Sequence, residues 1–140
     1  VITCFTSTFL ILNERASKIF FFIDSDILSL YKWINNNNIS NKNFFSYDYM
    51  GTFTPAFSSN RVFLGHWCET VNFKGRRELV NKFFNIDSQK QIKFLKDINI
   101  DYLIYGPDEK KLGKLDFSEL NNSLKIIYSI GNYDLVEVKK

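Results

Sequence analysis

Two hydrophobic spacings alternate along this chain, one typical of helices and the other typical of buried strands. The clearest helical spacing is that of Ile27, Leu30, Tyr31 and Ile34, which recur every three or four positions. Asp and Ser side chains at 24–26 can cap a helix that starts there, and the four asparagines that follow Ile34 are unfavourable inside a helix. We therefore predict a helix between these two signals.

Short apolar runs rich in β-branched and aromatic residues predict buried strands. They occur at 8–12, 19–23, 43–47, 61–64 and 102–105. Further helices are predicted at 73–84 and after Asp87-Ser88, where Ile92, Leu95 and Ile98 keep helical spacing. Near the end of the chain, the runs 123–130 and 133–138 flank Gly131-Asn132, and this pattern predicts a β-hairpin.

Strands that alternate with helices predict parallel βαβ units, and the hairpin adds an antiparallel edge. The expected fold class is α/β, a three-layer α/β sandwich with a Rossmann-like, mostly parallel sheet. The glycine fingerprint of dinucleotide-binding folds is absent, so no cofactor is predicted. Pro55 predicts a loop or short helical turn with Thr54 outside a helix, and Gly106-Pro107 predicts a turn leading into a solvated stretch at 108–111.

Composition narrows the function classes. The chain has 140 residues, 17% of them aromatic, which suits one folded domain over 1–140. A net charge of +3 is too small for a nucleic-acid partner to be expected. Two cysteines exclude a disulfide scaffold, and a single histidine excludes most multi-histidine metal sites.

The first block of the chain, residues 1–12, is apolar but shorter than the roughly 20 residues that cross a bilayer. The sequence begins with Val and has no basic start typical of a signal peptide. We therefore expect a fragment whose N-terminus lies upstream, with 1–20 as a linker.

The densest group of polar side chains is the run from Arg61 to Thr70, which follows a predicted strand, where α/β sheets bind ligands. Three interpretations compete. His66, Cys68 and Glu69 are acceptable zinc ligands, but Cys4 is the only distant partner. Cys68 is a possible nucleophile activated by His66, but the run offers no third group to orient the histidine.

The third interpretation is a structured loop in which Thr70 or Asn72 caps the next helix and Cys68 is a small buried side chain. We assign no catalytic and no metal-binding residue. The residues expected to bind a ligand are Arg61, His66, Trp67, Glu69, Thr70 and Arg76.

Other segments are expected to be structural. Tyr49 and Phe53 are expected in the core, together with Tyr47 and Phe57. Lys90, Lys93 and Lys96 form a basic stripe that is expected to be solvated, with anionic lipid headgroups as the alternative.

The order of several motifs carries a resemblance. The helix with Tyr31-Lys32-Trp33-Ile34 is followed by Gly51–Ala56, by the run Arg61–Thr70, and by Asp101–Pro107. This series resembles the soluble C-terminal domain of polytopic membrane proteins related to C-type glycosyltransferases, the mannosyl- and arabinosyltransferases that use polyprenyl-phosphate sugars. The resemblance covers about residues 24–112, and 1–20 and 113–140 have no match.

The resemblance implies a non-catalytic, extracytoplasmic domain that is membrane-associated and serves acceptor recognition or active-site closure. Its expected partners are the membrane portion of the parent protein and a polyprenyl-phosphate sugar or glycan acceptor, with Arg61, Gly65, His66, Glu69 and Thr70 lining the face turned to that portion. Two alternatives stay open: a stand-alone α/β enzyme with a Cys68/His66 site, and a protein-interaction module.

Overall fold

The computed structural model describes residues 23–139. The predicted strand at 8–12, nearly all of the one at 19–23 and the expected linker at 1–20 lie outside these residues. None of the helices within 23–139 is long and apolar enough to cross a bilayer.

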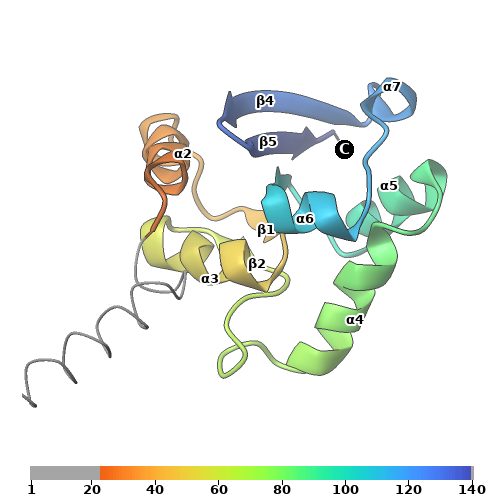
Figure 1. The fold of residues 1–140 in the computed structure, drawn as a ribbon, viewed down its shortest axis with the longest axis horizontal. Coiled ribbons are helices and arrows are strands. Elements are labelled where there is room, and N and C mark those ends of the chain that lie inside the picture. The colour runs from red at the N-terminus through yellow and green to blue at the C-terminus, as the bar shows by residue number, and fades with distance from the viewer. Residues whose placement is uncertain (1–22, 140) are drawn as a thin grey trace, which may run out of the picture.

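One mixed sheet organises the described chain (Figure 1). Its strands are β1 (Asn43–Phe45), β2 (Arg61–Val62), β3 (Tyr102–Tyr105), β4 (Leu124–Ile130) and β5 (Tyr133–Val138), in the order β2-β1-β3-β5-β4. β1 pairs in parallel with β2 and β3, and β5 pairs antiparallel with β3 and β4. The predicted parallel strands followed by an antiparallel hairpin are confirmed, although β1 and β2 are shorter than the sequence indicated.

The helices connect these strands. They are α2 (Ser25–Asn36), α3 (Asp48–Phe57), α4 (Phe73–Phe83), α5 (Ser88–Asp97), α6 (Pro107–Leu112) and α7 (Phe117–Leu120). The helices expected near 24–35, at 73–84 and after Asp87-Ser88 are confirmed as α2, α4 and α5.

Neighbouring residues of the central strands point into two different hydrophobic clusters, as alternation along a strand requires. Phe44, Ile104 and Leu135 pack with α2 and Met50 of α3. Their neighbours Phe45, Leu103 and Val136 pack with residues of α4 and α5. The sheet therefore separates two buried clusters, and Figure 1 shows α2 and α3 on one side of the strands with α4 and α5 on the other.

The sequence signals of α2 act as predicted. Asp24 accepts a hydrogen bond from the Asp26 N–H at 3.1 Å, which caps the helix. The residues buried by α2 are Ile27, Leu30, Tyr31 and Ile34, and each such burial contributes roughly 1.5–3 kcal/mol. The chain leaves the helix through Asn38, whose φ of 55° is a left-handed conformation that asparagine tolerates.

The prediction that Pro55 keeps Thr54 outside a helix is wrong, because both residues lie within α3. The buried Thr54 hydroxyl lies 2.9 Å from the Tyr31 hydroxyl, which also donates to the Met50 carbonyl at 3.0 Å. These contacts with α2 outweigh the local preference of a residue that precedes proline. Pro55 itself lies in the last turn, where few helical bonds follow it.

The stretch at 108–111, expected to be a solvated turn, forms part of a short helix, and the expected exposure is confirmed for Lys110 and Lys111 but is wrong for Glu109. Gly106 is the N-cap of α6 and Pro107 its first residue, a position that suits proline because its missing N–H needs no partner there. Glu109 lies on the inner side of this helix and is fully buried.

Candidate functional site

The carboxyl ends of the parallel strands place three connections at one edge of the sheet. α3 begins two residues after β1, the 63–72 segment follows β2, and α6 follows β3 after Gly106. Ligands of open α/β sheets bind at this edge, so a ligand-binding site is expected there.

Close backbone contact fixes α3 against the segment after β2. A Cβ at residue 51 would overlap the carbonyl oxygen of Leu64, and a Cβ at residue 65 would lie 3.1 Å from the carbonyl oxygen of Gly51. At position 51 only glycine permits this approach, whereas at position 65 a Cβ would be tightly packed. Gly51 and Gly65 therefore set the position of the residues that follow β2 relative to α3.

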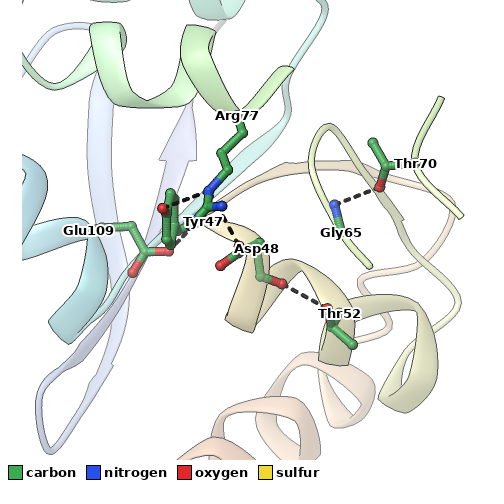
Figure 2. A network of polar contacts seen from close by, with 7 residues as sticks. All are labelled: Tyr47, Asp48, Thr52, Gly65, Thr70, Arg77 and Glu109. Carbon is green, nitrogen blue, oxygen red and sulfur yellow. Dashed lines mark hydrogen bonds and ion pairs between the residues drawn. The ribbon is translucent and has the colours of Figure 1, made fainter. Parts of the chain in front are cut away.

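The loop at 65–72, which we call the Trp67 loop, is closed by its own hydrogen bonds. The Gly65 N–H donates to the Thr70 hydroxyl at 3.0 Å (Figure 2). The His66 carbonyl accepts the N–H groups of Glu69 and Thr70, both at 3.0 Å. The predicted capping of α4 is wrong, because Thr70 bonds back to Gly65 and Asn72 occupies the N-cap position without a side-chain cap.

Thr70→Val is expected to lower the free energy of unfolding by about 1–2 kcal/mol, because it deprives the buried Gly65 N–H of its acceptor at similar side-chain volume. Urea denaturation measures the change. Thr52→Val is the matched control, since the Thr52 hydroxyl only donates to the Asp48 carbonyl within α3, and it is expected to stay within about 0.5 kcal/mol. Equal effects of both variants would contradict a special role for Thr70.

A cavity of about 320 Å³ lies between α3 and the Trp67 loop, and we call it the aromatic cavity. Tyr49 and Phe53 form an edge-to-face pair with ring centroids 4.9 Å apart. Its lining residues are Asp48, Tyr49, Thr52, Phe53, Gly65, His66, Trp67 and Phe73. The cavity combines an aromatic surface with a carboxylate and an imidazole, a composition typical of small-ligand sites.

Three further predicted residues line a second cavity of about 270 Å³, which shares Gly65 and His66 with the aromatic cavity, and we call it the polar cavity. These residues are Glu69, Thr70 and Arg76. Arg61 is exposed and lines a separate hollow with Arg76. The structure therefore divides the predicted ligand-binding set, with Trp67 in the aromatic cavity and His66 lining both cavities.

Two arginines of α4 support the site. Arg76 donates from Nη1 to the Phe63 carbonyl at 2.7 Å and lies over the Phe63 ring, so it holds the segment after β2 in place. Arg77 donates from Nε to the Tyr47 hydroxyl at 2.9 Å and lies 3.7 Å from the Asp48 carboxylate (Figure 2). The hydrogen bond with Tyr47 raises the pKa of the Arg77 guanidinium.

Glu109 joins two of the connections at this edge. Its buried carboxylate accepts the N–H of Tyr47 at 2.6 Å and the N–H of Gly106 at 3.0 Å, as Figure 2 shows for the Tyr47 side. Burial raises the pKa of the Glu109 carboxyl, and the bonds from the backbone N–H groups of Tyr47 and Gly106 oppose that increase. Glu109 thus fastens the start of α6 to the start of α3.

His66 and Cys68 were considered as zinc ligands and as a base and nucleophile pair. The His66 Nδ1 accepts the backbone N–H of Cys68 at 3.3 Å. Cys68 is exposed, so the expectation within the structured-loop interpretation that it is a small buried side chain is wrong. Within residues 23–139, no three His, Cys, Asp or Glu side chains are grouped as a metal site would require.

Five residues of the aromatic cavity were not among the predicted ligand-binding residues: Asp48, Tyr49, Thr52, Phe53 and Phe73. Tyr49 and Phe53 pack against the core cluster around α2, as expected, and they are also partly exposed at the cavity. A signal existed in the spacing, because 48, 49, 52 and 53 share one face of a helix that begins directly after a strand.

The described chain is thus a mixed α/β domain in which the aromatic cavity and the polar cavity lie beside the segment that follows β2. No protein-family model and no curated protein matches it. Among solved structures, it is similar to the C-terminal globular domain of an oligosaccharyltransferase from Archaeoglobus fulgidus, with a TM-score of 0.61 and 12% identity over 84% of this chain and 99% of that chain. At that identity, the similarity establishes the fold alone.

Proposed function

We propose that this chain is a non-catalytic, extracytoplasmic domain of a membrane glycosyltransferase-like protein and that it recognises a glycan acceptor or polyprenyl-phosphate sugar in the aromatic cavity. The similarity in fold to a globular domain of an oligosaccharyltransferase supports the class of parent protein. In this proposal the domain is a three-layer, Rossmann-like unit over 1–140, with 1–20 as the linker to the membrane portion. That membrane portion is its partner and carries out the sugar transfer.

The observation that carries the proposed binding role is the aromatic cavity beside the exposed indole of Trp67. A sugar ring presents apolar C–H faces and polar hydroxyl edges, so it suits aromatic rings beside hydrogen-bonding groups. Trp67 and Phe53 supply rings, and Asp48 supplies a carboxylate at the same cavity. The hydrogen bond between Gly65 and Thr70 closes the backbone of the Trp67 loop before any ligand arrives, which lowers the entropic cost of ordering the loop on binding.

Binding is tested by the fluorescence of Trp67 in a Trp33→Phe background, which leaves one tryptophan in the chain. The ring of Trp33 stacks on Tyr128, and phenylalanine preserves an aromatic partner there. Titration with a mannose oligosaccharide and with a short-chain polyprenyl-phosphate mannose is expected to change the Trp67 emission in a saturable way. Asp48→Asn is expected to weaken that binding at least about fivefold, because it removes the charge from the carboxylate that accepts hydrogen bonds from the sugar hydroxyls.

Ile126→Ala is the control, because Ile126 lies on β4 and is exposed, and it is expected to leave the titration unchanged. Two results would contradict the proposal. One is a Trp67 emission that does not change with either ligand, and the other is sugar transfer by this chain alone. Arg61→Ala and His66→Ala are expected to reduce the activity of the intact protein while the domain keeps a cooperative thermal transition.

A further inference from the structure

The Trp67 loop exposes the two most solvent-accessible large apolar side chains of residues 23–139. Trp67 is 68% exposed and Val71 is 78% exposed, compared with 46% for Leu28 and 43% each for Leu79 and Ile126. Figure 1 shows the 63–72 segment projecting away from the sheet, next to the first turn of α4. Both residues belong to the loop whose backbone is closed by hydrogen bonds among Gly65, His66, Glu69 and Thr70.

The segment that contains this loop carries the net positive charge of the sequence. Residues 61–82 hold five basic and two acidic side chains, and the rest of the 140-residue chain holds equal numbers of each, so this segment accounts for the whole net charge of +3. Arg61 before the loop and Lys74 after it are exposed, as is Glu69 within the loop. The net charge of this segment therefore favours an anionic partner.

The size of the apolar surface decides between two kinds of partner. A stable protein–protein interface buries at least about 1,000 Å² in total around a core of anchoring side chains, and two isolated side chains do not form such a core. Insertion into the interfacial region of a bilayer needs only a few apolar groups, for which Trp is favoured, with Lys and Arg beside them to contact the headgroups.

We propose that the Trp67 loop docks on a lipid bilayer with anionic headgroups, with the Trp67 indole and the Val71 side chain in the interfacial region. Lys74, the exposed cation that follows the loop, then lies at headgroup level. Because Trp67 also lines the aromatic cavity, docking would bring the mouth of that cavity to the membrane surface. The basic stripe of α5 is a weaker candidate, since Lys90 is paired with Asp87 at 2.7 Å and no large apolar side chain of that helix is exposed.

The test uses the whole chain with the Trp33→Phe change, so that all tryptophan emission comes from Trp67. Vesicles of phosphatidylcholine with phosphatidylglycerol are expected to shift that emission to shorter wavelength, and lipids brominated on the acyl chains are expected to quench it. Val71→Asp is expected to weaken vesicle binding at least about tenfold, because it places a charge in the interfacial region. Lys74→Gln is expected to weaken it about fivefold at low salt and less at high salt.

The apolar run at 1–12 can itself bind vesicles, so the emission of Trp67 and not sedimentation is the readout. Leu28→Ala is the control, since Leu28 is exposed on α2 and is expected to leave the emission shift unchanged. No blue shift with anionic vesicles, or a shift without quenching by brominated lipid, would overturn the proposal, as would full binding by Val71→Asp. The vesicles contain no sugar, so this outcome is independent of the glycan titration.

Discussion

Gly51→Ala is expected to lower the free energy of unfolding by about 3 kcal/mol, because the added methyl group would overlap the backbone carbonyl of Leu64. Gly51 is buried, and the neighbouring atoms that the methyl group meets are backbone atoms of Leu64 and Gly65, which cannot rotate away. Against a total stability of about 5–15 kcal/mol for a typical domain, this is a large fraction. Urea denaturation followed by circular dichroism measures it.

The loss has a second consequence, because the same contact positions the Trp67 loop against α3. Gly51→Ala is expected to alter the environment of Trp67 as well as stability, which fluorescence at low denaturant detects. Gly75→Ala is the matched control: its methyl group would lie 2.6 Å from Nδ2 of the Asn72 side chain, which can move, and alanine favours the helix by up to about 1 kcal/mol. A Gly51→Ala variant as stable as Gly75→Ala would show that the two segments separate without cost.

The elements that the sequence predicted well are those whose signals are local. β3 matches its predicted range because the apolar run at 102–105 is buried and its flanks break strands. The hairpin matches closely because Gly131 adopts the positive φ of 53° that the turn between β4 and β5 requires.

The errors come from contacts between residues that are distant in the sequence. Glu109 looks like a surface residue among charged neighbours, but its buried carboxylate accepts the N–H of Tyr47, 62 positions away, as well as that of Gly106. Thr54 is kept in α3 by Tyr31, 23 positions earlier. Neither partner can be identified from spacing, because local propensity is overridden by tertiary contacts.

Contacts between distant residues also explain why only part of the candidate site was predicted. The run at 61–70 was correctly placed beyond a strand end, since that rule depends only on the order of elements. Which of its side chains share a cavity depends on how Gly51 brings α3 against Gly65. The sequence therefore predicted the loop but not the helix that forms the other wall.

Glu109→Ala is expected to lower the free energy of unfolding by about 2–5 kcal/mol. The substitution removes the acceptor of two N–H groups, those of Tyr47 and Gly106, and a buried donor left without its partner costs about 1–3 kcal/mol. It also leaves a cavity where the buried side chain lay. Chemical denaturation at pH 7 measures the loss, and a change below about 0.5 kcal/mol would show that these two bonds are not needed.

Glu109→Gln separates the charge of this side chain from its size. Because burial raises the pKa of the native carboxyl, the folded chain holds the Glu109 proton more tightly than the unfolded chain does. The stabilisation from this proton is complete below the carboxyl's pKa in the unfolded chain and is lost as the pH rises through its higher pKa in the folded state. Glutamine does not titrate, so the stability of wild type minus that of Glu109→Gln is expected to fall as the pH rises over this interval. Urea denaturation of both proteins at a series of pH values from 4 upward measures the difference, and a difference that stays constant with pH would mean that the Glu109 carboxyl has the same pKa in both states.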